Sequence, residues 1–328
     1  MSTITFRGAL YEGSSSETVL DALLRQGADA PHSCKKGVCH ACLLRCTNAR
    51  PPSLAQEGLR PTQREQGYFL PCRAPASHDM VLAEPRDAGL AVWAELRSKK
   101  LYAADICRLR FARPAAFHYH AGQFVNLRRP DGLMRSYSLA SVPQADEHLE
   151  VHVRRLKNGK MSSWLFDELE VGQSIELCGP TGSCFYLPGR EAGDLLLIGT
   201  GTGLAPLVGI ARDALLWGHH GRVRLYHGSD TVIGLYLDAD LHRLAERFHN
   251  FAYTPCLGGS ESLEGVARGF ANDVAFAAHP KLQGWRVFLC GAPAMVTAAK
   301  KSAYLSGASL ADIHADPFEL ADLRLTAR

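Results

Sequence analysis

The sequence predicts a multidomain chain in which two β-rich parts precede a part that alternates strands with helices. The pattern of strand-like and helix-like runs changes near Pro85 to Gly89 and again near Pro188 to Gly193. From Asp194 onward, strand-like and helix-like runs alternate, which is the pattern of a parallel, doubly wound α/β sheet. We therefore expect three domains, at residues 1–88, 89–190 and 191–328.

The expected elements follow this order. In the first part, one helical stretch from Thr18 to Gln26 accompanies short strand-like runs and a cysteine-rich loop. The second part contains alternating strands such as Gly122 to Leu127 and Leu149 to Arg154. In the third part, strands are expected at 195–199, 222–227, 251–254 and 287–291, with helices that end near Trp217 and cover 235–248.

Composition limits the classes of function. The 328 residues are 46% hydrophobic and 21% charged, as in ordinary soluble proteins. The 36 basic and 33 acidic residues are mixed along the chain, so we expect no nucleic-acid partner. The start lacks a signal-peptide pattern, and the uncharged run from Leu195 to Ala211 is broken by four glycines and one proline. We expect a cytoplasmic, monomeric protein without a membrane span.

The ten cysteines suggest metal or redox chemistry, because a cytoplasmic protein keeps its thiols reduced. Cys34, Cys39 and Cys42 have C-x4-C-x2-C spacing, and Cys72 follows after 29 intervening residues. This is the plant-type [2Fe–2S] ligand spacing, in which one loop supplies three thiolates and a distant segment the fourth. Zinc is the alternative, but structural zinc usually takes two close ligand pairs, and a second C-x2-C is missing.

The run from Val19 to Cys42 resembles plant-type ferredoxins, and the resemblance covers most of the first 85 residues. It implies an α+β, β-grasp domain that holds the cluster. His40 departs from the family, whose reductase-linked members have glycine there; it would narrow the loop or adjust docking, or be a solvent-facing substitution. Cys46 could compete with Cys72 as a ligand, but we favour a bystander thiol.

The second part carries four fragments: A-G-Q-F-V, R-S-Y-S-L-A-S, V-H-V-R-R-L and G-K-M-S-S-W-L. Arginine can clamp phosphate, tyrosine can stack on a flavin ring, and a helix start can accept a pyrophosphate. In this order, the fragments resemble the FAD-binding antiparallel β-barrel of the ferredoxin–NADP reductase superfamily, over about residues 90 to 188. FMN is the alternative cofactor.

The resemblance implies a role for each position. A phosphate contact is implied for Arg135, stacking on the flavin for Tyr137, and a place facing the reactive flavin nitrogen for Ser138, with Ser136 in the same cofactor-binding segment. Further FAD contacts are implied for His152, Val153 and Arg154 along the flavin or its ribityl chain, and for Lys160, Met161 and Ser162 at the pyrophosphate.

Two fragments point to a dinucleotide. I-G-T-G-T-G-L-A-P, from Ile198, ends a strand and opens a helix, and F-L-C-G-A-P-A-M-V, from Phe288, ends a later strand. Both resemble the nicotinamide-binding domain of the same superfamily. The implied NAD contacts are Gly199, Thr200, Gly201, Thr202, Gly203, Gly291, Pro293 and Met295, with Cys290 near the hydride path. The alternative for Cys290 is a packed strand cysteine.

Two further positions bear on nucleotide binding. D-I-H-A-D-P-F resembles the final strand of the superfamily, which implies that Phe318 covers the flavin until nicotinamide displaces it; a core-packing phenylalanine is the alternative. Asp230 follows the second strand of the nucleotide domain, where an acidic side chain accepts ribose hydroxyls and repels the extra phosphate of NADP. We therefore expect a preference for NADH, with a turn-capping Asp230 as the alternative.

The module order resembles the reductase components of bacterial ring-hydroxylating dioxygenases and multicomponent monooxygenases. The resemblance implies hydride transfer from NADH to FAD and single-electron transfer through the cluster to a partner terminal oxygenase. One alternative is a reductase for a non-oxygenase acceptor, such as a deoxysugar dehydrase or a desaturase. Another is a redox-sensing interaction protein that uses the cluster as a signal.

Overall fold

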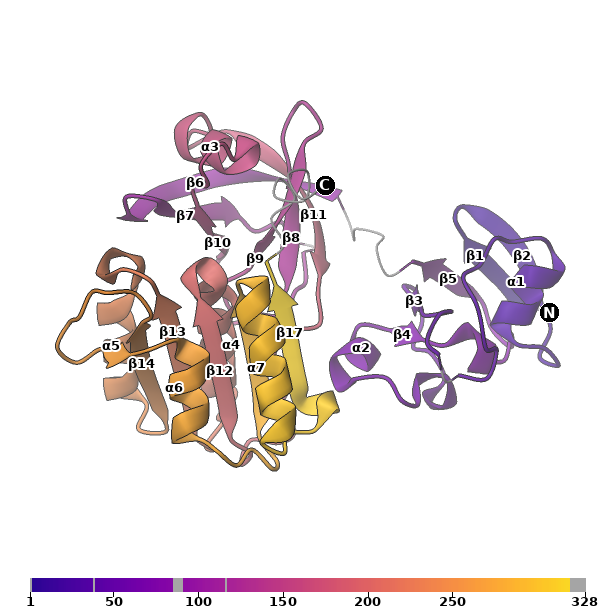
Figure 1. Ribbon diagram of the computed structural model, residues 1–328. Helices are drawn as coiled ribbons and strands as arrows, with labels where there is room; N and C mark the ends of the chain where they lie inside the picture. The colour runs from indigo at the N-terminus through magenta and orange to yellow at the C-terminus, as the bar shows by residue number, and fades with distance from the viewer. Residues whose placement is uncertain (1, 38, 85–90, 116, 319–328) are drawn as a thin grey trace, which may run out of the picture. The chain divides into compact units, whose positions relative to one another are not determined.

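The computed structural model describes residues 2–37, 39–84, 91–115 and 117–318, and it divides into two compact units, Met1–Asp87 and Ala88–Arg328 (Figure 1). The second unit contains both an antiparallel β-domain and a parallel α/β domain. The expected fold class is confirmed, while the three domain boundaries stay predictions. Among the residues described, no helix combines the length and low polarity that a bilayer span requires.

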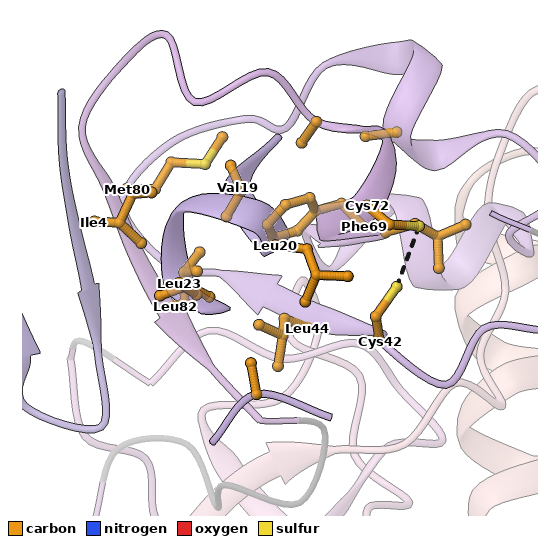
Figure 2. Packing of buried hydrophobic residues seen from close by; sticks show 14 of the residues in the cluster. Ile4, Val19, Leu20, Leu23, Cys42, Leu44, Phe69, Cys72, Met80 and Leu82 are labelled. Atoms are coloured by element: carbon orange, nitrogen blue, oxygen red, sulfur yellow. Dashed lines mark hydrogen bonds between the residues drawn. The ribbon is translucent and has the colours of Figure 1, made fainter. Parts of the chain in front are cut away.

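The N-terminal unit is a five-stranded sheet in the order β2-β1-β5-β3-β4, crossed by α1. Its hydrophobic core, which Figure 2 shows, places α1 residues such as Leu20 against sheet residues such as Leu44 and Phe69. Thr18 caps α1 by accepting a 3.1 Å hydrogen bond from the amide of Asp21. The elements are β1 (Ser2–Phe6), β2 (Ala9–Gly13), α1 (Val19–Arg25), β3 (Leu44–Cys46), α2 (Pro61–Glu65), β4 (Tyr68–Phe69) and β5 (Met80–Ala83).

The flavin half of the C-terminal unit is an antiparallel sheet in the order β10-β7-β6-β11-β8-β9. A bridge between Leu139 and Val151 links the two ends of this order, so the sheet curves toward a closed barrel. The elements are β6 (Ala91–Ala103), β7 (Ile106–Ala112), β8 (Phe124–Arg128), β9 (Met134–Ser138), β10 (His148–Arg154), α3 (Lys160–Asp167) and β11 (Ser174–Thr181).

The nicotinamide half is a parallel sheet in the order β15-β14-β13-β12-β16-β17. Residues of α4 and α5 share one buried cluster with one sheet face, and residues of α6 and α7 share another with the opposite face, so the sheet is doubly wound. The elements are β12 (Leu195–Thr200), α4 (Leu204–Leu216), β13 (Val223–Ser229), α5 (Asp238–Arg247), β14 (Phe251–Leu257), β15 (Ala267–Arg268), α6 (Ala271–Ala278), β16 (Arg286–Gly291), α7 (Pro293–Leu305) and β17 (Ile313–Pro317).

One element differs from the expectation. The helix expected over 235–248 begins only at Asp238, because Leu237 has a left-handed φ of 64°, which a helix interior does not allow. The residues before it instead form a 3-10 turn, Val232–Gly234, and a short link that contains Tyr236. This link runs along the flavin half.

The two halves of the C-terminal unit are closely packed. A Cβ at Gly209 of α4 would lie 3.1 Å from the carbonyl oxygen of Ala140, so only glycine allows this approach without adjustment. On the same helix, Arg212 donates two hydrogen bonds to Asp146, at 2.9 and 3.0 Å. These contacts hold the two halves of the unit against each other.

Candidate functional site

The four cysteines expected to hold a cluster lie in two pairs. The amide of Cys34 donates to the Cys39 sulfur, and the amide of Cys39 donates to the Cys34 sulfur, both at 3.4 Å. The sulfurs of Cys42 and Cys72 lie 3.4 Å apart at the edge of the core (Figure 2). Two neighbouring thiol pairs fit a cluster with two irons, each of which takes two protein thiolates.

The environments of the two pairs differ. Cys39 is exposed and Cys34 half-buried, whereas Cys42 and Cys72 are buried. Burial raises the pKa of the Cys72 thiol to about 11, and the neighbouring Cys42 adds to the shift. Cys72 would therefore become a thiolate ligand only with the help of the positive iron. Cys46 lies on β3 and donates instead to the side-chain oxygen of Asn48, at 3.3 Å.

His40 lies in the cluster loop with a left-handed φ of 55°, a conformation that favours glycine. Its imidazole lies against Gly58, where an added Cβ would be 3.5 Å from Nε2. The His40 side chain therefore contacts the segment that packs beside the loop and is not purely solvent-facing.

A cleft of about 1270 Å³ separates the flavin half from the nicotinamide half of the C-terminal unit. Both halves line it, as does the end of the last strand. Most of the residues expected at the flavin and dinucleotide sites meet here: Arg135, Ser136, Tyr137, Ser138, His152, Arg154, Lys160, Met161, Ser162, Thr200, Gly201, Thr202, Asp230, Gly291, Pro293, Met295 and Phe318.

The start of α3 forms the phosphate-binding part of the flavin wall. Gly159 is the N-cap, so the amides of the first three helical residues, Lys160 to Ser162, have no acceptor within the helix. The Ser162 hydroxyl accepts from the amide of Leu156, at 3.1 Å, and thereby fixes the loop before the helix. Free amides at a helix start, beside the arginine of β9, fit the pyrophosphate of FAD.

On the nicotinamide wall, the two glycine-containing fragments interlock. A Cβ at Gly203 would lie 2.7 Å from the Cα of Gly291, and a Cβ at Gly291 would lie 2.7 Å from the carbonyl oxygen of Thr200. The Thr200 hydroxyl also accepts a 3.0 Å hydrogen bond from the amide of Ala292. The turns after β12 and β16 thus form one surface, at the carboxyl edge where doubly wound sheets bind nucleotides.

Four of the expected site residues do not line the cleft: Val153, Gly199, Gly203 and Cys290. The Val153 side chain is buried in the barrel core, because alternation along β10 sends its neighbours His152 and Arg154 to the cleft side. The Cys290 thiol is fully buried, 3.7 Å from the sulfur of Cys184. Burial, then the bond to Cys184, raises the pKa of Cys290 well above its usual range, so the thiol keeps its proton.

Asp316 lines the cleft and is absent from the residues expected there. Its carboxylate accepts a 3.2 Å hydrogen bond from the Ser138 hydroxyl. Burial raises the pKa of Asp316 to about 6, although the Ser138 bond acts against the shift. The available signal was its position two residues before Phe318. The other lining residues outside the expected set include Phe124, Asn126, Phe270 and Asn272.

Asp230 is exposed at the end of β13 and lines the cleft. The turn that follows is held by Ser229, whose hydroxyl accepts from the Thr231 amide at 3.2 Å and donates to the Thr231 carbonyl at 2.8 Å. The Ser229 hydroxyl and the Glu261 carboxylate, which accepts from the Val232 amide at 2.6 Å, thus both hold this turn.

Comparison with known families covers each part of the chain. Residues 4–77 match a 2Fe-2S iron-sulfur cluster binding domain, residues 93–186 an oxidoreductase FAD-binding domain, and residues 197–301 an oxidoreductase NAD-binding domain. The reductase subunit of an aromatic O-demethylase from Amycolatopsis is 36% identical over 96% of this chain and 98% of its own length. The chain belongs to the family of ferredoxin–FAD–NAD reductases. This reductase oxidises NADH with FAD and a [2Fe–2S] cluster.

Other relatives span the reductase almost completely. The reductase component of the naphthalene 1,2-dioxygenase/salicylate 5-hydroxylase systems of Ralstonia is 32% identical over 93% of this chain and 94% of its own length. Among solved structures, an Amycolatopsis cytochrome P450 reductase superposes with a TM-score of 0.68 at 33% identity, covering 97% of this chain and 99% of the other. All three modules are therefore shared.

Proposed function

We propose that this reductase passes single electrons from its cluster to the metal centre of a separate terminal oxygenase. Relatives with the same modules are named as reductase components of an aromatic O-demethylase, a naphthalene dioxygenase system and a phenol monooxygenase. The observation that carries the proposal is that one chain holds both a flavin and nicotinamide cleft and two pairs of cluster thiols. Bound FAD would accept a hydride from NADH and release its two electrons one at a time.

In the proposed flavin site, Arg135 and the first-turn amides of α3 hold the phosphates, and the Tyr137 ring packs on the flavin. Both positions line the same wall of the cleft, which supports the assignment. Val153 contributes through its backbone, because its side chain is committed to the barrel core. Phe318 covers the opposite side, where its amide donates to the carbonyl of Gly291 at 2.8 Å.

Ser138 and Asp316 form a hydrogen-bonded pair that lines this site. The Ser138 hydroxyl donates to Asp316, and a carboxyl with a pKa of about 6 gains and loses its proton near neutral pH. We assign Asp316 the role of supplying or removing a proton through Ser138 as the flavin changes its redox state. Cys290 supports the wall behind this pair, opposite Asp316 on the neighbouring strand.

In the proposed dinucleotide site, the turn from Gly199 to Gly203 meets the pyrophosphate of NADH. Gly291, Pro293 and Met295 continue this surface at the start of α7. Asp230 accepts hydrogen bonds from the ribose hydroxyls and disfavours NADPH.

Use of NADH and ten cysteines without a disulfide among those described support a place in the cytoplasm. Solution mass measurement tests the expected monomer.

A non-oxygenase acceptor is the second candidate. The CDP-6-deoxy-L-threo-D-glycero-4-hexulose-3-dehydrase reductase of Yersinia pestis is 28% identical over 89% of this chain and 90% of its own length. The same modules thus occur in a reductase named for a dehydrase. The acceptor alone distinguishes the two candidates.

Reconstitution tests the proposal. Purified reductase, NADH and a terminal oxygenase encoded beside it should together oxidise the substrate of that oxygenase, and Cys72→Ser should abolish this coupled activity. The variant should still reduce ferricyanide, which can take electrons from flavin directly. Coupled activity that survives in Cys72→Ser would contradict the cluster as outlet, and absence of steady NADH turnover would instead favour the sensor hypothesis.

A further inference from the structure

A row of polar side chains crosses from the flavin half to the nicotinamide half beside the cleft. The Glu150 carboxylate lies 3.0 Å from Nε2 of His152, and Nδ1 of His152 lies 3.0 Å from the hydroxyl of Tyr236. Glu150 and His152 belong to β10, whereas Tyr236 belongs to the link before α5. His152 and Tyr236 are each 4% exposed, so water does not compete for their bond.

The partners of His152 determine where its proton lies. Burial alone would raise the pKa of Glu150, but its hydrogen bonds to His152 and Arg110 and the charge of Arg110 outweigh burial and lower the pKa to about 2. An ionised carboxylate only accepts, so Nε2 carries the proton and donates it to Glu150. Nδ1 is then an acceptor for the phenol. Burial raises the pKa of Tyr236 well above its usual range, which keeps the phenol protonated as the donor.

Tyr236 also packs against the residue that holds the dinucleotide turn. Its ring meets His227 edge-on, with ring centroids 5.7 Å apart and planes at 89°. His227 is fully buried, and its Nε2 lies 3.2 Å from the carbonyl oxygen of Gly201, which can only accept. Gly201 has a left-handed φ of 54° and lines the cleft. Tyr236 therefore stands between the flavin strand and the phosphate-binding turn.

We propose that Tyr236 is a positioning residue for hydride transfer, because it ties His152 of the flavin strand to the turn that carries the dinucleotide. Hydride transfer requires the reacting atoms within about 3.5 Å of each other and aligned, and small displacements slow such steps strongly. The Tyr236 hydroxyl is the hydrogen-bond donor from the nicotinamide half to a flavin-wall residue at this point. Its removal leaves Nδ1 of His152 buried without that donor. The flavin wall and the nicotinamide wall of the cleft are then held less firmly in their relative positions.

The chain offers a matched control. The Tyr186 hydroxyl lies 3.3 Å from Nδ1 of His219, with ring centroids 5.6 Å apart and planes at 90°. This second pair is also buried, at 1% and 4% exposure, and neither member lines the cleft. Tyr236→Phe and Tyr186→Phe therefore each delete a hydroxyl from a buried tyrosine–histidine pair, but only in the first pair does the histidine line the cleft.

The FAD- and cluster-loaded variants are compared by three readouts. Tyr236→Phe should slow flavin reduction by NADH about tenfold and change the primary isotope effect measured with NADH deuterated at C4. It should also speed amide hydrogen exchange in segments 150–154 and 199–203 without nucleotide, while the FAD content stays at the wild-type level. Tyr186→Phe should leave the reduction rate, the isotope effect and exchange in both segments unchanged.

The proposal would be overturned if Tyr236→Phe kept the wild-type reduction rate, isotope effect and exchange. It would also be overturned if Tyr186→Phe slowed flavin reduction equally, because this would show a general effect of lost packing. If Tyr236→Phe fails to hold FAD, Glu150→Gln replaces it. The amide can donate to Nε2 and so move the imidazole proton to Nδ1, where the phenol must accept instead of donate, and the contact between the two walls is rearranged. This variant should change the same readouts in the same direction, and unchanged readouts would reject the proposal.

Discussion

The Ser138 hydroxyl donates a hydrogen bond to the Asp316 carboxylate at 3.2 Å, although 178 residues separate the two in the sequence. Ser138 ends β9 of the flavin half, and Asp316 lies on β17 of the nicotinamide half. The contact therefore exists only when both halves are folded and packed. It places a titratable group beside the residue expected to face the reactive part of the flavin.

The raised pKa of Asp316 predicts a pH-dependent stability. The folded protein binds this proton more tightly than the unfolded chain, whose carboxyl has the ordinary value of 3.8. The contribution of the raised pKa to the free energy of unfolding is fully present below pH 3.8, where Asp316 is protonated in both states. It is lost as the pH rises to about 6, the pKa in the folded protein. The amide introduced by Asp316→Asn does not have to lose a proton, so the variant should be more stable than wild type at pH 7.5, by on the order of 3 kcal/mol. Melting followed by flavin fluorescence at pH 5 and 7.5 measures the difference.

Asp213→Asn is the control for that experiment. Burial also raises the pKa of Asp213 to about 6, but this residue bonds Gln144 and does not line the cleft. The stability of both variants, compared with wild type at the same pH, should increase as the pH rises. Only Asp316→Asn should slow flavin reduction, by about tenfold or more. Equal reduction rates in wild type and Asp316→Asn would remove the proton role from Asp316.

For the cluster, Cys72→Ser and Cys46→Ser form a pair of buried substitutions in the same core. Cys72 lies 3.4 Å from Cys42, whereas Cys46 bonds Asn48, so only the first substitution should remove a ligand. We expect Cys72→Ser to lose the visible iron–sulfur absorption and the paramagnetic signal of the reduced protein. Cys46→Ser should retain both, because a serine hydroxyl can replace the bond to Asn48. The reverse result would reassign the fourth ligand.

For hydride transfer, we expect Cys290→Ala to slow flavin reduction by NADH while FAD stays bound. The thiol is fully buried behind the turn formed with Gly203 and opposite Asp316, so its loss alters the wall of the transfer site and not the flavin clamp. Cys184→Ala removes the other thiol of the same 3.7 Å pair and serves as control. Stopped-flow rates that fall equally in both variants would make Cys290 a packing residue.

The sequence predicts best what depends on short spacing. The loop ligands Cys34, Cys39 and Cys42 lie within nine residues, and the glycine turn from Gly199 to Gly203 is a single segment, so local pattern was enough to indicate both. The Ser138–Asp316 contact depends on how two domains pack, and no periodicity reports this packing. The late start of α5 depends on one left-handed residue, Leu237, of a type that rarely adopts that conformation.

The burial of Cys290 illustrates the same limit. The motif around it predicts a position at the end of a strand, which β16 confirms. Whether a side chain at a strand end faces the cleft or the core depends on its neighbours. Here the neighbour is Cys184, which lies 106 residues away in the flavin half. The sequence shows both cysteines but contains no local signal that pairs them.

The choice of dinucleotide gives the last prediction. Asp230 directly follows β13 and lies exposed at the cleft, and hydrogen bonds to Ser229 and Glu261 hold the following turn. The carboxylate is therefore available for the adenosine ribose, where it would accept from the two hydroxyls of NADH and repel the phosphate of NADPH. We expect wild type to favour NADH in kcat/KM.

Asp230→Ala should reduce that preference about tenfold, mainly through a lower KM for NADPH. Ser229→Ala is the matched control, since it disturbs the turn but leaves the charge. It should weaken binding of both nucleotides without changing their ratio. Equal use of both nucleotides by wild type would reject the preference. A ratio unchanged in Asp230→Ala would show that discrimination lies elsewhere in the cleft, and a ratio changed only in Ser229→Ala would assign it to the shape of the turn.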